Sequence, residues 1–150
     1  MNIIRGLHNL TNLSGSVVTI GNFDGVHIGH QQIISRLVAQ AKTLNLPSVL
    51  ISFSPTPQSF FGREQARLTS FKQKHQQLEK LGLDIHLIIT FNQQFSKLSA
   101  DDFIEKILLE KLGMRFCLIG DDFRFGSKRT GDFKLLQSFA QRHAFKVENT

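Results

Sequence analysis

The sequence predicts an α/β domain built on an open, mostly parallel β-sheet of about five strands, with helices on both faces. Short runs rich in β-branched and aliphatic residues alternate with stretches whose apolar residues recur at helical spacing. The strand-like runs are apolar almost throughout, which is typical of strands covered on both faces, and the connections are short. We treat residues 1–150 as one domain, because 150 residues suffice for a core of their own.

Five runs carry the strand pattern, at residues 16–20, 48–53, 85–90, 115–119 and 145–147. The first of them, Ser-Val-Val-Thr-Ile, is dominated by β-branched residues, which favour the pleated backbone of a buried strand. Residues 1–15 are polar, are interrupted by glycine and show no clear period. We expect no more than a short edge strand or a turn there.

The first two predicted helices have recognisable ends. One runs from His27 and should stop before Pro47, because the residue preceding a proline disfavours the α region. The next follows Ser70 and Gln73, which have the spacing of a capping box, and Gly82 is a suitable residue to end it.

Two more helices are predicted, one capped by Ser99 and ending at Gly113, the other beginning near Thr130. His75 lies on the apolar stripe of the second helix, so we interpret it as a packed, hydrogen-bonded histidine rather than a ligand. Cys117 is the only cysteine and sits in an apolar run, so it is predicted to be a small buried hydrophobe. A lone cysteine cannot form an internal disulfide, which favours a cytoplasmic location.

The net charge of +6 favours anionic partners such as nucleic acid, acidic membranes or phosphorylated small molecules. The basic residues are scattered, and neither zinc spacing, a helix-turn-helix pattern nor an aromatic-basic stripe is present. We therefore expect no nucleic-acid partner. No apolar run approaches ~20 residues and the N-terminus lacks a signal peptide's apolar core, so no membrane partner is expected.

Three unusual loops, at 21–30, 54–61 and 120–132, each follow a predicted strand. The carboxyl ends of parallel strands share one edge of the sheet, and ligands bind there at the point where the strand order reverses. The three loops are therefore predicted to build one pocket.

The first loop has the chemistry of a phosphate site. Gly21 and Gly25 allow a tight turn, and the helix that follows offers unpaired N–H groups to an anion. His27 and His30 lie three residues apart and project from one face of that helix, where they can donate hydrogen bonds to phosphate oxygens. Two alternatives remain: a metal site, although zinc-binding pairs more often lie four residues apart with a third ligand, and a pair of ordinary surface histidines. Neither a Gly-x-Gly-x-x-Gly nor a P-loop pattern is present.

The His-x-Gly-His sequence at 27–30 resembles that of the nucleotidyltransferase superfamily. Together with 21–26, it is similar to the FMN adenylyltransferase (FAD synthetase) module of the bacterial bifunctional riboflavin kinase/FAD synthetase family. Further segments agree: Phe-Ser-Pro-Thr-Pro at 53–57, Arg-Leu-Thr at 67–69, Gly-Asp-Asp-Phe-Arg-Phe-Gly at 120–126 and Gly-Asp at 131–132. The resemblance covers nearly the whole chain.

The resemblance implies a Rossmann-like nucleotidyltransferase fold and a reaction in which the 5′-phosphate of FMN attacks the α-phosphorus of ATP. Mg²⁺ accompanies ATP, and the products are FAD and pyrophosphate. His27 and His30 are then the catalytic residues, which hold the ATP phosphates, and the other residues of the ATP side are Gly21, Asn22, Phe23, Asp24 and Gly29. The flavin side consists of Pro55, Pro57, Asp122, Phe123, Arg124 and Phe125. No residue of the chain is assigned as a metal ligand.

In one respect the sequence departs from that family. The family has a later Ile-Ser-Ser-Thr-x-Ile/Val-Arg segment, which grips the triphosphate, and then a separate C-terminal riboflavin kinase domain. Neither occurs in residues 1–150. We therefore expect a truncated adenylyltransferase domain that binds FMN or ATP more weakly than its full-length parent. Two alternatives are another adenylyl- or cytidylyltransferase with the same histidine motif, and a non-catalytic flavin- or nucleotide-binding module.

Overall fold

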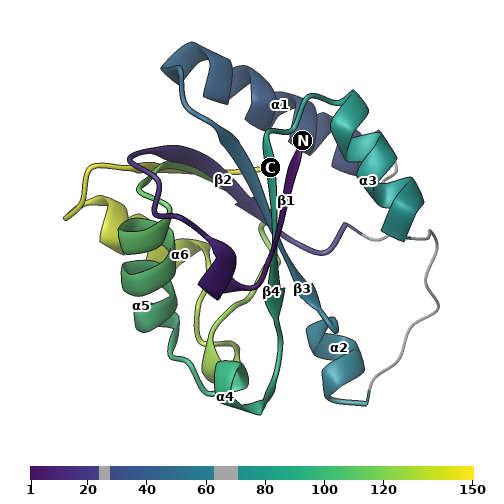
Figure 1. The fold of residues 1–150 in the computed structure, drawn as a ribbon. Helices are drawn as coiled ribbons and strands as arrows, with labels where there is room; N and C mark the ends of the chain where they lie inside the picture. The colour runs from purple at the N-terminus through teal and green to yellow at the C-terminus, as the bar shows by residue number, and fades with distance from the viewer. Residues whose placement is uncertain (24–27, 63–70) are drawn as a thin grey trace.

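A computed structural model describes residues 1–23, 28–62 and 71–150, which form one parallel sheet with helices on both faces (Figure 1). The predicted α/β class is confirmed. The strands are β1 (Asn2–Arg5), β2 (Ser16–Ile20), β3 (Ser48–Ser54), β4 (Ile85–Thr90), β5 (Met114–Ile119) and β6 (Lys146–Asn149). The described residues thus contain six strands where about five were expected.

The additional strand is β1, at the edge of the sheet. It pairs in parallel with β4, with Asn2 opposite Ile85. Three of its four residues are exposed, so no apolar alternation marks it in the sequence. Strand β1 is therefore identified by its pairing with β4 and not by an apolar pattern of its own.

The strand order is β1-β4-β3-β2-β5-β6, and every pairing is parallel. From β2 the chain steps outward to β3 and β4, then returns to the other side of β2 for β5 and β6. The strand order therefore reverses between β2 and β5. In open parallel sheets this is where a crevice forms beyond the carboxyl ends of the strands.

The helices are α1 (Ile28–Leu44), α2 (Pro57–Phe60), α3 (Phe71–Lys80), α4 (Gln93–Ser96), α5 (Ala100–Asp102), the π-helical η2 (Phe103–Lys111) and α6 (Phe133–Ala140). Two short 3₁₀ turns are η1 (Leu7–Asn9) and η3 (Ser127–Arg129). Helix α1 ends before Pro47, as predicted, and α3 ends at Lys80, two residues before Gly82, whose φ of +88° is the left-handed conformation that stops a helix. The expected first helical residue, His27, and the expected cap Ser70 lie outside the described residues.

The two later helices agree with the sequence except at one start. The Ser99 hydroxyl accepts a hydrogen bond from the Asp102 backbone N–H at 3.1 Å, which confirms the predicted cap. Gly113 has a φ of +55°, and a Cβ there would lie 2.7 Å from the Leu13 carbonyl oxygen, so glycine is required. The predicted helix start near Thr130 is wrong. Helix α6 begins at Phe133, because the Asp132 carboxylate caps it by accepting from Leu135 N–H at 2.9 Å.

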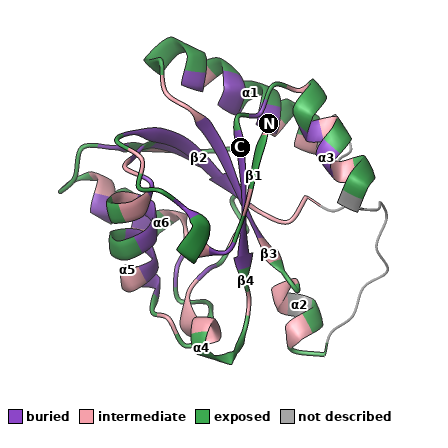
Figure 2. Ribbon diagram, in the orientation of Figure 1, coloured by how far each residue is buried: buried purple, intermediate pink, exposed green. Residues whose placement is uncertain are grey.

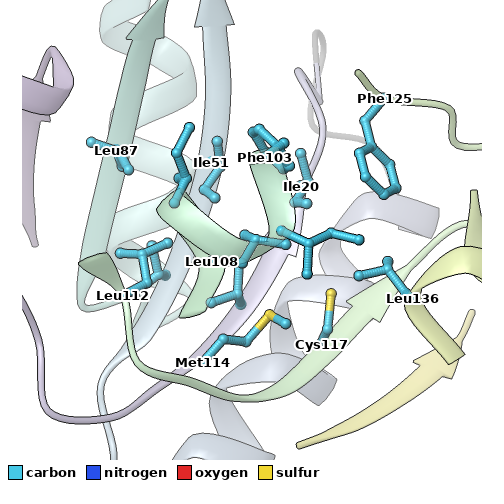
Figure 3. Packing of buried hydrophobic residues seen from close by; sticks show 14 of the residues in the cluster. Ile20, Ile51, Leu87, Phe103, Leu108, Leu112, Met114, Cys117, Phe125 and Leu136 are labelled. Atoms are coloured by element: carbon cyan, nitrogen blue, oxygen red, sulfur yellow. The ribbon is translucent and has the colours of Figure 1, made fainter. Parts of the chain in front are cut away.

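Buried residues concentrate in the central strands and recur along the helices beside them (Figure 2). Their side chains form two clusters that hold the layers together. Helices α1 and α3 pack on one face of the sheet, where they cover Val17 and Leu50. On the other face, η2 and α6 cover Val18, Ile51 and Cys117 (Figure 3). Cys117 is fully buried, as predicted, and burial raises the pKa of its thiol to about 12, so it stays protonated.

Candidate active site

The turn that follows β2 is fixed on its neighbours by backbone and side-chain hydrogen bonds. Gly21 N–H donates to the Ile51 carbonyl at 2.9 Å, and the Asn22 side-chain oxygen accepts from Phe53 N–H at 3.0 Å. The Lys74 ammonium donates to the backbone carbonyl oxygen of Asn22. The turn is therefore held from β3 on one side and from α3 on the other.

Beyond the turn, α1 begins at Ile28, so Gly29 and His30 lie in its first turn. The His30 ring stacks on Phe23, with 4.6 Å between ring centroids and 29° between planes. The first-turn N–H groups of a helix this long carry partial positive charge and suit an anion. We call residues 21–23 and 28–30 the polar half of the site. Asp24 and His27 lie outside the described residues.

Beside the polar half lies a cavity of about 470 Å³, within the size range of small-ligand sites. We call it the aromatic cavity, because seven phenylalanines line it: Phe53, Phe61, Phe91, Phe95, Phe103, Phe123 and Phe125. The other lining residues are Gly21, Asn22, Pro57, Ser96, Leu98, Asp122, Arg124, Gly126, Lys128 and Arg129. Because Gly21 and Asn22 belong to both, the polar half and the cavity adjoin.

All three predicted loops contribute to this cavity, which confirms that they form one pocket. The second loop supplies Pro57, the first residue of α2, and Phe61 just after it. Pro55 is exposed and does not line the cavity. Of the two prolines assigned to the flavin side, the structure therefore brings only Pro57 to the cavity.

The third loop brings Asp122, Phe123, Arg124 and Phe125 to the cavity, as predicted. The rings of Phe123 and Phe125 are stacked, with centroids 6.0 Å apart. Phe125 is also 95% buried against the core, with its ring 5.5 Å from Phe103, so it serves as both core residue and cavity wall (Figure 3). Arg124 lies 3.8 Å from the carboxylate of Asp132, the α6 cap.

The sequence interpretation missed the segment after β4. Phe91 directly follows that strand, and its ring lies 5.9 Å from Phe53 and 5.6 Å from Phe95. Asn92 caps α4 by accepting from Phe95 N–H at 2.7 Å, which orients the second ring. A usable signal was present, because Phe91 follows a predicted strand and so must lie on the same edge as the three loops.

Within the described ranges, no three His, Cys, Asp or Glu side chains gather in a way that could hold a metal ion. The same ranges contain no helix long and apolar enough to cross a membrane.

The cations of the cavity are Arg124, Lys128 and Arg129. Lys128 and Arg129 have φ values of +56° and +57°.

Among solved structures, the chain is similar to a structure described as a macrolide-efflux protein from Streptococcus pneumoniae. The TM-score is 0.86 at 21% identity, over 100% of this chain and 58% of that one. A universal stress protein from Archaeoglobus fulgidus aligns with a TM-score of 0.51 at 8% identity, over 92% of this chain and 93% of that one. At these identities the likeness concerns the fold alone.

Curated relatives named bifunctional riboflavin kinase/FMN adenylyltransferase match nearly the whole chain. The relative from Buchnera aphidicola (Schizaphis graminum) is 47% identical over 98% of this chain and 48% of its own length. Those from Haemophilus influenzae and Escherichia coli K12 are 43% and 40% identical, over 99% and 100% of this chain and 49% of their own lengths. The chain thus spans about half the length of the curated relatives that it matches. The FAD synthetase family model matches residues 9–150, and the chain belongs to that family.

Proposed function

We propose that the protein to which this chain belongs transfers AMP from ATP to the 5′-phosphate of FMN, giving FAD and pyrophosphate. The observation that carries the proposal is the adjacency of the polar half and the aromatic cavity, which share Gly21 and Asn22. One substrate of this reaction is a polyphosphate and the other carries a flat, mostly apolar ring system. An anion site beside a cavity of phenylalanine rings suits that pair. The names of the curated relatives supply FMN as the acceptor.

The polar half is proposed to bind ATP. The first turn of α1 offers N–H groups to phosphate oxygens, and His30 lies in that turn. The attacking group is a phosphate of FMN, so the protein needs no covalent intermediate. Its residues position the two phosphates and stabilise the charge that develops between them. The proposed ATP-side residues are Gly21, Asn22, Phe23, Asp24, His27, Gly29 and His30, with the two histidines catalytic.

The aromatic cavity is proposed to bind the flavin of FMN. Phenylalanine rings stack favourably on flat aromatic groups, and guanidinium groups pair with phosphate. From the sequence we assigned Pro55, Pro57, Asp122, Phe123, Arg124 and Phe125 to this side. Phe91 and Phe95 are now added, because they line the same cavity.

Mg²⁺ is proposed to accompany ATP. This ion usually keeps several waters and binds through one or two carboxylates together with substrate phosphates. The described residues offer no cluster of carboxylate or imidazole ligands for a cage built by the protein.

For the full-length protein we propose a cytoplasmic enzyme that also phosphorylates riboflavin, as the names of the relatives suggest. The segment that grips the triphosphate is proposed to follow Thr150, as in the family that the sequence resembles. Thr150 N–H donates to the Ile119 carbonyl at 3.0 Å, at the carboxyl end of β5. Neither nucleic acid nor a membrane is proposed as a partner.

The test is direct. Full-length protein is incubated with FMN, ATP and Mg²⁺, and the flavins are separated and quantified together with pyrophosphate. We expect equal amounts of FAD and pyrophosphate, and no FAD when CTP replaces ATP. A folded protein that forms no FAD would overturn the proposal, and a product formed with CTP would favour a cytidylyltransferase.

A further inference from the structure

A buried polar array lies between α3 and the sheet, outside the aromatic cavity. The Ser52 hydroxyl of β3 is 2.6 Å from Nε2 of His86 on β4. The other nitrogen of that ring, Nδ1, lies 3.4 Å from Nδ1 of His75 on α3. All three residues are buried, which confirms the sequence-based interpretation of His75 as a packed histidine. The array fixes α3 to two strands through polar contacts.

Both imidazoles are held in the neutral form. Burial, assisted by the charges of Lys74, His75 and Arg5, lowers the pKa of His86 to about 3. Burial and the cations Arg5 and Lys74 also lower the pKa of His75. Near neutral pH the two rings therefore bring no charge into the layer, and the ammonium of Lys74 is the cation that α3 places next to them.

Lys74 precedes His75 and is half-buried. Its ammonium donates to the backbone carbonyl of Asn22, whose side-chain oxygen accepts from Phe53 N–H at 3.0 Å. Phe53 follows Ser52, a member of the buried array. Asn22 of the polar half is thus hydrogen-bonded to α3 through its backbone and to β3 through its side chain.

We infer that Lys74 is a positioning residue for the nucleotide, because it holds the Asn22 carbonyl and with it the orientation of the Gly21–Phe23 turn. The buried array keeps α3 at the distance from which Lys74 reaches that carbonyl. The inference rests on the proposed function for its reference to ATP. The contact itself is independent of any reaction.

Two substitutions test this in the full-length protein. Lys74→Met keeps most of the side chain's length and removes the donor and the charge, whereas Lys74→Arg keeps both. Lys72→Met is the matched control, because Lys72 is exposed on the same helix. Hydrogen bonds from charged groups contribute enough that Lys74→Met should raise the KM for ATP by about tenfold or more. We expect Lys74→Met to leave the KM for FMN unchanged, and Lys72→Met to leave both KM values unchanged. Lys74→Arg should restore most of the lost apparent affinity for ATP.

A second readout does not depend on activity. Because the charge of Lys74 lowers the pKa of His75, Lys74→Met should raise the NMR-determined pKa of His75, while Lys72→Met should leave it unchanged. The inference is overturned if folded Lys74→Met keeps the wild-type KM for ATP. It is equally overturned if both KM values rise together with a loss of thermal stability that Lys74→Arg does not restore. If wild-type protein makes no FAD, the proposed function fails, and the His75 titration still decides whether Lys74 sits in this array.

Discussion

The polar half and the aromatic cavity share an edge of the sheet but use different parts of the chain. In the polar half, the groups available to the proposed ligand are chiefly backbone N–H groups of the turn after β2 and of the start of α1. In the cavity they are phenylalanine side chains from five separate segments: the end of β3, the turn after α2, the β4–α4 connection together with α4, the start of η2 and the 120–132 loop.

This difference follows from what each ligand group requires. An anion is satisfied by a few dipoles whose direction the backbone fixes, so one continuous motif is sufficient. A flat apolar ring needs surface on several sides, which no single loop can supply. Damage to the polar half should therefore lower the rate or raise the KM for ATP, while damage to the cavity should lower the affinity for FMN.

The largest effect is expected in the polar half. His30→Ala removes a donor that is proposed to stabilise charge on the transferring phosphate, so kcat should fall by ~10²–10³. The same loss is expected for His27→Ala. The dissociation constant for FMN, measured by calorimetry, should stay unchanged because neither imidazole is assigned to the cavity.

His143→Ala is the matched control. His143 is exposed and precedes β6, so it lies toward the amino ends of the strands, away from the site. Its activity should equal that of the wild type. Wild-type turnover in a folded His27→Ala/His30→Ala double variant would remove the histidines from the mechanism. The polar half would then no longer differ from the cavity in its effect on the rate.

The same contrast explains how much could be predicted. The polar half was recognisable because its determinants, from Gly21 to His30, are contiguous. Pocket formation by the three loops also followed, since parallel strands impose a common edge. Phe91 and Phe95 were missed because each is an ordinary apolar residue locally. The place of Phe91 after a predicted strand indicated the edge of the sheet, and the pairing of β4 between β1 and β3 then brings both rings beside Phe53.

The errors in the fold have related causes. Strand β1 falls where a short edge strand or a turn was expected, and because it exposes most of its residues the hydrophobic period could not decide between the two. The start of α6 was placed too early because Thr130 and Asp132 are both capable caps, and only the hydrogen bond from Leu135 shows which is used. The π-helical winding of η2 was not predicted either, because its apolar spacing also fits an α-helix.

An effect of intermediate size is expected on folding stability when the pH is lowered. It arises from the buried histidines on the α3 side of the polar half. Unfolded His86 takes up a proton near pH 6.5, whereas folded His86 does so only at about 3. The unfolded state therefore binds more protons between these values, and stability falls as the pH drops from 6.5 towards 3. His86 should contribute a loss of about 2 kcal/mol by pH 5, and His75 acts in the same direction.

Urea unfolding of residues 1–150, followed by circular dichroism between pH 8 and pH 5, measures this loss. His86→Asn keeps a group able to bond to Ser52 but removes the titration, so its stability should vary less with pH. The Arg5 and Lys74 cations face the same array and remain in both proteins. Equal pH slopes for wild type and variant would show that His86 does not create the acid sensitivity.

The smallest effect is expected in the cavity, from Phe91→Leu. The Phe91 ring lies 6.0 Å from Phe61 and 5.6 Å from Phe95, so it links two walls of the cavity. Aromatic pairing contributes about 0.5–1.5 kcal/mol beyond area burial, so the affinity for FMN should fall by up to about tenfold. Affinity for ATP should not change.

Phe145→Leu is the control, because Phe145 is buried in the core before β6, toward the amino ends of the strands. It should lower thermal stability without weakening FMN binding. If Phe91→Leu weakens ATP and FMN binding equally, the two halves do not recognise different substrates, and the cavity supports the fold rather than the flavin.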